Sequence, residues 1–320
     1  MKVTVLLNSS GNCFVNSSGN GSVNSSGNGF VNSLEKGLMN SIVINGVKDF
    51  FPAHIFDCGQ AFRWNSDGDG YIGIVKDKVI RVICNEDTIV LENCTYEDYE
   101  RVWRHYLDLD RDYTELKQTL SEDPILKEAI GYGWGLRILN QDPWETLTSF
   151  ILSANNNIVR IKKIIERLSE KFGTSIIWEG REYFTFPKPE ILANADDDAL
   201  KSCGCGYRGP YIRTTARMVL EGIISLEQLK NCSYEEAHRV LLNCMGVGDK
   251  VADCILLFAL EKSEAFPVDV WVKRIMEYYY ISQPVPIKQI RSVAADKFGK
   301  HAGLAQQYLF YYAREQKIGK

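Results

Sequence analysis

The fold is decided by the stretch LLNCMGVGDKVADCILLFALEKSEAFPVDVWVKRIM, residues 241–276. Its first part is predicted to be helical, residues 245–248 form a tight turn, and a second helix is predicted over about residues 249–260. Gly246 and Gly248 let the backbone turn sharply. Such a turn exposes amide groups beside a helix N-terminus, where a phosphate can bind without a side chain. This helix-hairpin-helix pattern predicts a sequence-independent contact with a nucleic-acid backbone, and the alternative is a plain turn between helices.

Two ionisable residues accompany this hairpin. Lys250 lies in the first turn of the second helix, where the helix dipole and partial burial both disfavour an ammonium ion. This placement suits a nucleophile, and the alternative is a lysine that contacts phosphate. Asp269 precedes the apolar-periodic run VWVKRIMEYYY, so we expect it to cap that helix and to be kept ionised by amide groups. The intervening chain is long enough to bring Asp269 back to Lys250, a pairing suited to attack at a sugar carbon that develops positive charge.

The preceding chain divides into a strand-rich and a helical part. Between about residues 41 and 94, β-branched runs are separated by polar turns with Gly and Asp at their tips, which predicts an antiparallel sheet. The apolar period then becomes helical, and residues placed as helix N-caps recur at Thr95, Asp123, Asp142 and Ser233. We therefore predict an α+β fold, with a small N-terminal antiparallel sheet domain with helices over residues 41–140 and a mostly α-helical body over residues 141–320 that carries the hairpin.

Residues 8–31 repeat with a period of eight, as NSSGNCFV, NSSGNGSV and NSSGNGFV. Asn, Ser and Gly dominate each unit, so the repeat cannot bury enough apolar area to offset the entropy lost on ordering. We expect residues 1–40 to form a flexible, low-complexity tail outside the fold.

Composition limits the classes of protein to which the chain can belong. Its 320 residues include 45% hydrophobic and 24% charged residues, which is typical of a globular protein, and no apolar run approaches the roughly 18–20 residues that cross a bilayer. The nine cysteines are odd in number and scattered, which favours reduced thiols. We expect an intracellular monomer with no cofactor. We also expect no catalytic metal, because no His or Cys spacing matches a metal site.

The net charge of −4 hides an asymmetry between the two halves of the chain. Residues 1–150 contain 13 Lys and Arg against 21 Asp and Glu, whereas residues 151–320 contain 24 against 20. The acidic sum therefore does not exclude a basic face on the second half, where the hairpin lies.

Residues 241–276 resemble the helix-hairpin-helix, Gly/Pro-rich loop and aspartate signature of the DNA glycosylase superfamily. The segments GVGDKVADCI and PVDV are most similar to those of 8-oxoguanine DNA glycosylases. Further landmarks of that family recur in the same order: Gly59 in CGQAFRW, Asn155 to Asn157 with Arg160, Gly206-Tyr207-Arg208, and Gln306 with Phe310 in GLAQQYLF. The agreement runs from about residue 50 to residue 315.

The resemblance implies a bifunctional enzyme of base excision repair that excises 8-oxoguanine opposite cytosine from duplex DNA, after the base is swung out of the helix. Lys250 would displace the base at C1′ and form a Schiff base, and β-elimination would then nick the strand. Asp269 would stabilise the oxocarbenium-like sugar. The DNA backbone would be contacted by Gly246, Val247 and Gly248.

The same resemblance implies a slot for the damaged base. The main-chain oxygen of Gly59 would accept a hydrogen bond from N7 of the lesion, where normal guanine presents a lone pair, and glycine lets the backbone approach closely. Cys254 and Phe310 would cover the two faces of the base, and Gln306 would lie at its Watson–Crick edge. Without the resemblance, Cys254 and Phe310 would be interpreted as core residues.

A second group would bind the partner base. Arg160 and Arg208 are similar to the pair that binds the estranged cytosine, with Asn155 alongside and Tyr207 wedged into the gap, and the alternative for Arg160 is a solvated helix face. Trp271 stands where many relatives carry a histidine that touches a DNA phosphate. A backbone cation site seen in relatives would use the carbonyls of Leu242, Cys244 and Val247.

Two alternatives remain open and a third is disfavoured. A non-catalytic DNA-binding module would use the hairpin for phosphate contact and would bind any duplex without releasing a base. A glycosylase for another lesion, such as an alkylated base, would share the plan of the fold but would not need Lys250. An endonuclease III or adenine-glycosylase type of enzyme would carry a C-terminal four-cysteine iron–sulfur cluster, and no cysteine follows Cys254.

Overall fold

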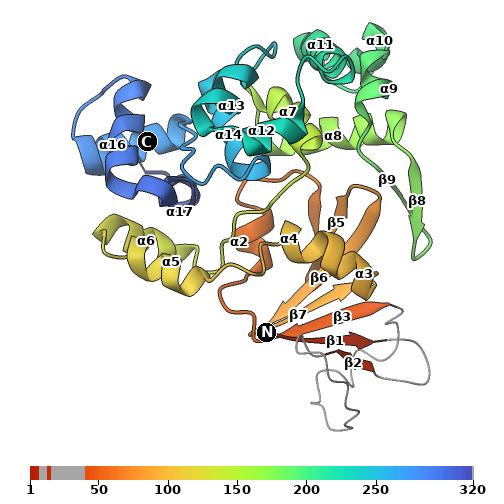
Figure 1. Cartoon of the computed structure of the whole chain (residues 1–320), viewed down its shortest axis with the longest axis horizontal. Helices are drawn as coiled ribbons and strands as arrows, with labels where there is room; N and C mark the ends of the chain where they lie inside the picture. The colour runs from red at the N-terminus through yellow and green to blue at the C-terminus, as the bar shows by residue number, and fades with distance from the viewer. Residues whose placement is uncertain (7–12, 16–39, 319–320) are drawn as a thin grey trace.

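The computed structural model describes residues 1–6, 13–15 and 40–318. Its N-terminal part is a seven-stranded sheet with the strand order β2-β1-β3-β7-β6-β5-β4 (Figure 1). The strands are β1 (Lys2–Leu6), β2 (Cys13–Val15), β3 (Ser41–Asn45), β4 (Trp64–Asp67), β5 (Gly70–Val75), β6 (Lys78–Asn85) and β7 (Thr88–Glu92). Every neighbouring pair in this sheet is antiparallel, so the sheet predicted between residues 41 and 94 is confirmed.

Strand β1 pairs with β3 and thereby joins the sheet. Val3 and Val5 are buried in the core of the sheet domain, because alternate residues of a strand point to the same face. The prediction that residues 1–40 all lie outside the fold is therefore wrong for β1, and also for β2, which pairs with β1. Residues 7–12 and 16–39 of the predicted tail lie outside the described residues.

Aromatic packing fixes the short helices of the sheet domain against the sheet. These helices are α2 (Pro52–Phe56), α3 (Tyr96–Asp98) and α4 (Arg104–Tyr106), with the π-helical turn η1 (Tyr99–Trp103) between the last two. Trp64 of β4 stacks on Phe56 of α2 with ring centroids 3.9 Å apart, and its Nε1 donates to Oη of Tyr106 at 2.9 Å. The end of α2 is thus held in place, and the chain that follows it leads directly to Gly59.

The helical body lies beside the sheet domain (Figure 1). Its α-helices are α5 (Tyr113–Leu120), α6 (Pro124–Tyr132), α7 (Pro143–Ser153), α8 (Ile158–Phe172), α9 (Pro189–Ala193), α10 (Asp197–Ser202), α11 (Gly209–Leu220), α12 (Leu226–Asn231), α13 (Tyr234–Leu241), α14 (Asp249–Ala259), α15 (Val270–Met276), α16 (Ile287–Phe298) and α17 (Ala302–Gln316). The shorter turns of helix are η2 (Gly206–Arg208), η3 (Glu277–Ile281) and η4 (Gly299–His301). The predicted α+β fold is confirmed. Helices α5 and α6 lie within the predicted sheet domain of residues 41–140, but their buried residues pack in the core of the helical body.

Side-chain caps fix several helix starts as predicted. Thr95 and Asp98 form a reciprocal capping box at α3. The side chains of Asp123, Asp142 and Ser233 accept hydrogen bonds from the first turns of α6, α7 and α13. These bonds satisfy amide groups that have no partner within the helix, which is why such residues mark helix starts in the sequence.

One element of the body was not expected. The strands β8 (Ser175–Trp178) and β9 (Arg181–Phe184) form an antiparallel hairpin between α8 and α9. Four-residue strands are too short to give a clear alternating pattern in the sequence. In the described part of the chain no helix is both long and apolar enough to cross a bilayer. The assembly state and the cellular compartment stay predictions.

Candidate active site

The turn between α13 and α14 has a conformation that requires glycine. Gly246 has a φ of +84°, and a Cβ there would lie 2.6 Å from Cδ2 of Tyr211. Gly248 is the N-cap of α14, with an extended backbone. The predicted hairpin is confirmed, and it places Lys250 in the first turn of α14.

The carbonyls expected to form a cation site lie in this turn. The N–H of Val247 donates to the carbonyl of Cys244 at 3.1 Å, and Leu242 is exposed as the C-cap of α13. Both this site and the contact of the turn with a DNA backbone stay predictions. Within the described ranges, no three His, Cys, Asp or Glu side chains are grouped so that they could hold a metal ion.

A buried carboxylate links the second helix of the hairpin to two neighbouring helices. Asp253 of α14 is fully buried and accepts a hydrogen bond from Oη of Tyr234 on α13 at 2.7 Å. Arg291 of α16 donates to its other oxygen, and this ion pair opposes the effect of burial, which raises the pKa of Asp253. Two helices, α13 and α16, therefore hold α14 in one orientation, and with it the position of Lys250 on that helix.

Asp269 is the N-cap of α15, as predicted. Its carboxylate accepts hydrogen bonds from the N–H groups of Trp271 at 3.0 Å and Val272 at 2.8 Å. Burial raises the pKa of Asp269 above the ordinary value of 3.8. The two cap bonds and the charges of Lys250 and Arg314 act in the opposite direction but do not outweigh burial. The prediction of a cap that holds the carboxylate in place is confirmed, whereas the net direction of its pKa follows burial and not the cap.

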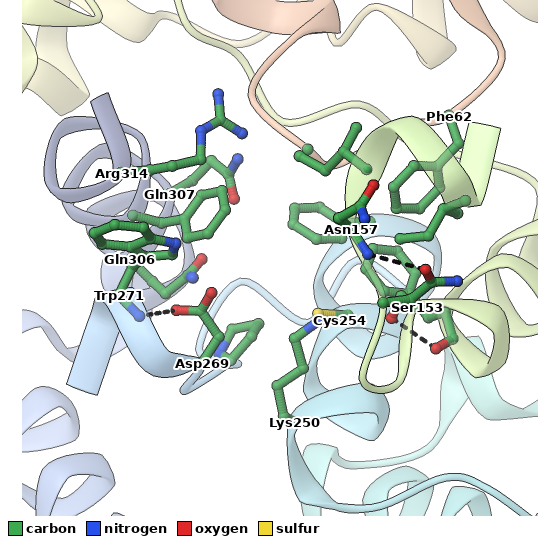
Figure 2. A pocket seen from close by; sticks show the side chains of 18 of the residues that line it. Phe62, Ser153, Asn157, Lys250, Cys254, Asp269, Trp271, Gln306, Gln307 and Arg314 are labelled. Atoms are coloured by element: carbon green, nitrogen blue, oxygen red, sulfur yellow. Dashed lines mark hydrogen bonds between the residues drawn. The ribbon is translucent and has the colours of Figure 1, made fainter. Parts of the chain in front are cut away.

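Lys250 and Asp269 line the same cavity, which has a volume of about 480 Å³. Figure 2 shows Lys250 and Cys254 on one wall, with Asp269 and Trp271 on the facing wall. All six residues predicted for catalysis and for the base slot line this cavity: Gly59, Lys250, Cys254, Asp269, Gln306 and Phe310. They come from the loop after α2, from α14, from the start of α15 and from α17, so the tertiary structure brings them together.

The amine of Lys250 lies in a partly aromatic environment. Its Nζ is 5.0 Å from the ring centroid of Phe150 on α7, a residue not predicted from the sequence. Cys254 follows one turn later on α14, and the charge of Lys250 opposes the effect of burial on the pKa of its thiol. Burial raises the pKa of the Cys254 thiol to about 11, so it stays protonated and uncharged at neutral pH. This wall of the cavity therefore presents an amine beside a neutral, polarisable surface.

Gly59 has a backbone conformation that other residues rarely adopt. Its φ is +85°, and a Cβ there would lie 3.2 Å from Cδ1 of Ile158 and 3.4 Å from Cε1 of Phe310. The main chain at Gly59 therefore borders the cavity without a side chain, and its role in recognising a base stays a prediction.

Gln306 carries an unsatisfied polar atom at the cavity. The residue is 4% exposed, and its Oε1 is buried without a hydrogen-bond partner among the described residues. Leaving a buried acceptor without a partner costs about 1–3 kcal/mol, and a ligand that donates a hydrogen bond to Oε1 removes this cost.

Three of the four residues predicted to bind the partner base lie together at the loop after α7. Arg208 is 4% exposed and donates from Nε to the carbonyl of Ala154 at 3.0 Å and from Nη2 to that of Asn155 at 3.2 Å. Tyr207 is 55% exposed, and its ring centroid is 4.3 Å from the guanidinium of Arg208. Arg160 is exposed in the first turn of α8, and no hydrogen bond or ring contact of the described residues joins it to the other three. The role of this group in binding a base stays a prediction.

Comparison with known proteins identifies the family. Residues 42–147 match the model of the 8-oxoguanine DNA glycosylase N-terminal domain, and residues 148–298 match that of the HhH-GPD superfamily base excision DNA repair proteins. An N-glycosylase/DNA lyase of Saccharomyces cerevisiae is 36% identical, over 81% of this chain and 82% of its own. The chain belongs to the 8-oxoguanine DNA glycosylase family. The "Probable N-glycosylase/DNA lyase" of Methanothermobacter thermautotrophicus is 35% identical over 69% of this chain and 76% of its own.

Solved structures agree with this membership of the 8-oxoguanine DNA glycosylase family. The Clostridium acetobutylicum 8-oxoguanine glycosylase/lyase, in complex with double-stranded DNA containing cytosine opposite 8-oxoguanine, is 44% identical with a TM-score of 0.85. The match covers 87% of this chain and 96% of that one. A 3-methyladenine DNA-glycosylase of Archaeoglobus fulgidus, 24% identical with a TM-score of 0.72, shares the fold.

Several residues that line the cavity were not predicted from the sequence. They are Phe62, Phe150, Ser153, Gln307 and Arg314. A signal for two of them exists in α17, because Gln307, Phe310 and Arg314 are spaced three and four residues apart and share one helix face. The apolar residues give no such signal, since a ring that lines a cavity and a ring that fills a core have the same pattern.

Proposed function

We propose that this chain is a bifunctional 8-oxoguanine DNA glycosylase and AP lyase in which Lys250 is the nucleophile and Asp269 its electrostatic partner. One observation carries the proposal: Lys250 and Asp269 face each other across a cavity whose walls also include the residues predicted to bind the damaged base. The names of the relatives from Methanothermobacter and yeast support the same two activities.

The reaction has two stages on one sugar. The amine of Lys250 attacks C1′ while the bond from C1′ to the base breaks, and the base leaves with the electron pair and takes up a proton. The carboxylate of Asp269 stabilises the positive charge that C1′ carries as this bond breaks. The nitrogen then loses one proton, and its electron pair breaks the bond from C1′ to O4′ as O4′ takes up a proton. The sugar ring thereby opens to a protonated Schiff base, which makes the C2′ protons acidic. Removal of a proton from C2′ expels the 3′ phosphate and breaks the C3′–O bond, which nicks the strand.

Recognition of the lesion rests on the proton that 8-oxoguanine carries at N7. The carbonyl of Gly59 accepts a hydrogen bond from that proton and meets a lone pair in normal guanine. The unsatisfied Oε1 of Gln306 suits the N–H groups at the Watson–Crick edge of a guanine ring. Cys254, an uncharged thiol, and Phe310 cover the two faces of the base.

Gly59→Ala is expected to lower the free energy of unfolding by about 1–2 kcal/mol and to reduce 8-oxoguanine excision at least about tenfold. The new methyl group is strained at a φ of +85° and crowds Ile158 and Phe310. Denaturant melts and single-turnover excision assays measure the two effects. Gly180→Ala is the matched control, since its φ is +71° and no atom of the described residues lies within 4 Å of the new Cβ. Equal losses of excision in both variants would contradict a role for the space beside Gly59.

The partner in this reaction is duplex DNA, and the bound DNA of the Clostridium acetobutylicum structure supports that assignment. Arg160 and Arg208 bind the cytosine left behind, because arginine offers only donors and cytosine presents acceptors. Arg208 already donates to two carbonyls and holds the loop that carries Asn155, so its removal also alters that loop. Arg160 is exposed, and its side chain makes no such structural bond to any residue that the structure describes, which makes it the cleaner residue to change.

Arg160→Gln is expected to reduce excision opposite cytosine about tenfold and to change excision opposite the other three bases less, because one base-reading arginine supplies about 1–3 kcal/mol of discrimination. Single-turnover rates on four duplexes, each with 8-oxoguanine opposite a different base, give the comparison. Arg167→Gln removes an exposed arginine further along α8 and serves as the control. A uniform loss over all four duplexes would instead indicate general DNA binding by Arg160.

The proposed function as a whole is tested with the wild-type protein and an excess of duplex containing 8-oxoguanine opposite cytosine. We expect several bases released per protein molecule, nicked product, and a covalent complex after borohydride reduction. Binding to any duplex without base release would overturn the proposal in favour of a non-catalytic module. Release of alkylated bases but not of 8-oxoguanine would favour a glycosylase for another lesion.

A further inference from the structure

The loop that presents Gly59 is fixed from helix α17. Nε2 of Gln307 donates to the carbonyl of Cys58 at 3.0 Å, and Nη2 of Arg314 donates to the carbonyl of Asp57 at 2.9 Å. These are the two carbonyls immediately before Gly59. Helix α17 also carries Gln306 and Phe310, so one rigid element holds both the loop and two walls of the base slot.

The other end of the loop is fixed by the segment between α6 and α7. Nε2 of Gln60 donates to the carbonyl of Arg137 at 2.8 Å, and its Oε1 accepts from the N–H of Leu139 at 2.9 Å. Gln60 is fully buried, and its own carbonyl accepts from the side chain of Gln141 at 2.7 Å. Both ends of the loop are therefore fixed. At the end before Gly59, the bonds come from Gln307 and Arg314 of α17.

Arg314 is the side chain that contacts both sides of the slot. Its guanidinium lies 5.4 Å from the ring centroid of Phe310, one turn earlier on α17. Its Nη1 is 3.4 Å from the place a Cβ on Gly59 would occupy, and is buried without a hydrogen-bond partner in the described part of the chain. A planar guanidinium presents several donors in fixed directions from different nitrogens, whereas a lysine amine is a single point charge on a flexible stem.

We propose that Arg314 is a positioning residue that determines specificity for the damaged base, by fixing the spacing between the carbonyl of Gly59 and the ring of Phe310. This inference rests on the proposed function. The slot must match a planar base on both its edge and its face, and a displacement of either wall by about 1 Å is enough to cost up to a hundredfold in rate. An abasic sugar leaves the slot empty and does not depend on this spacing.

An electrostatic effect on the catalytic carboxylate is the competing explanation. The charge of Arg314 acts to lower the pKa of Asp269, so its loss would also weaken the reaction through Asp269. That effect would extend to every substrate whose reaction uses Asp269, and it would move the acidic limb of the pH–rate profile. A change in spacing affects only substrates that carry a base in the slot.

The experiment compares Arg314→Met and Arg314→Lys with wild type in single-turnover assays on two duplexes. One contains 8-oxoguanine opposite cytosine, and the other contains an abasic site opposite cytosine. Arg101→Met, which removes an exposed arginine that is paired with Glu97 on the sheet domain, is the charge control and is expected to keep both rates. Thermal melts of all variants show whether the fold is retained.

We expect Arg314→Met to lower 8-oxoguanine excision about ten- to hundredfold and abasic-site cleavage by a far smaller factor. The acidic limb of the pH–rate profile for abasic-site cleavage is expected to have the same midpoint as in wild type. Arg314→Lys, which keeps the charge but not the planar guanidinium, is expected to remain defective on 8-oxoguanine. Equal losses on the two duplexes, or a wild-type rate for Arg314→Lys on 8-oxoguanine, would overturn the inference. Failure of wild type to excise 8-oxoguanine would overturn the proposed function instead.

Discussion

Lys250→Gln is expected to abolish the covalent complex and to reduce 8-oxoguanine excision by at least about 10³-fold. Glutamine has a similar length and keeps the helix, but its amide cannot attack C1′ or form a Schiff base. The measurement is borohydride trapping on duplex with 8-oxoguanine opposite cytosine, followed by single-turnover excision on the same duplex.

Lys288→Gln is the matched control for this change. It removes an exposed amine on α16, away from the cavity, and is expected to trap as wild type does. Trapping of Lys250→Gln at the wild-type level would show that another amine is the nucleophile. Retained excision without trapping would show that water attacks C1′ directly, as in a glycosylase without lyase activity.

Asp269→Asn is expected to lower 8-oxoguanine excision about 10²- to 10³-fold, because it removes the negative charge that stabilises the sugar cation. Asparagine is as good an N-cap as aspartate, so α15 should start at the same place and the loss should reflect charge alone. Single-turnover excision gives the rate. Asp112→Asn is the control, because that carboxylate caps α5 through the same bonds, to the N–H groups two and three residues later.

The pH dependence of the same two proteins provides a second measurement of the role of Asp269. Burial raises the pKa of Asp269 above 3.8, and only the ionised form stabilises a cation. As pH falls, the wild-type rate should therefore begin to fall at a higher pH than an ordinary aspartate would produce. The Asn variant should lack that limb. If the acidic limb had the same midpoint in wild type and in Asp269→Asn, a group other than Asp269 would be responsible for it.

The parts of the site that the sequence predicted correctly depend on local signals. The turn at Gly246 and Gly248 and the cap at Asp269 each involve residues within a few positions of one another. Local geometry of this kind is set by backbone conformation and by amide groups at helix ends, which residue types report directly. The same reason explains the correct prediction of the cap at Thr95.

The parts that were missed depend on contacts between distant segments. Strand β1 was predicted to belong to a tail. Its partner β3 lies beyond the repeat of residues 8–31, and pairing between strands so far apart in the chain leaves no local sequence pattern that predicts it. Arg314 and Asp57 are separated by 257 residues, and Gln307 and Cys58 by 249. The net direction of the pKa of Asp269 was also beyond the sequence, since it depends on how deeply the folded chain buries the carboxylate.

The sequence by itself determined the hairpin, the helix starts and the resemblance that singles out Lys250 and Asp269, because each is encoded by residues close together in the chain. Only the tertiary structure decided that these two side chains face one cavity, that Gln306 leaves an acceptor unsatisfied there, and that α17 holds the Gly59 loop. Those facts follow from how α2, α14, α15 and α17 pack around the cavity, and packing between distant elements depends on the whole chain.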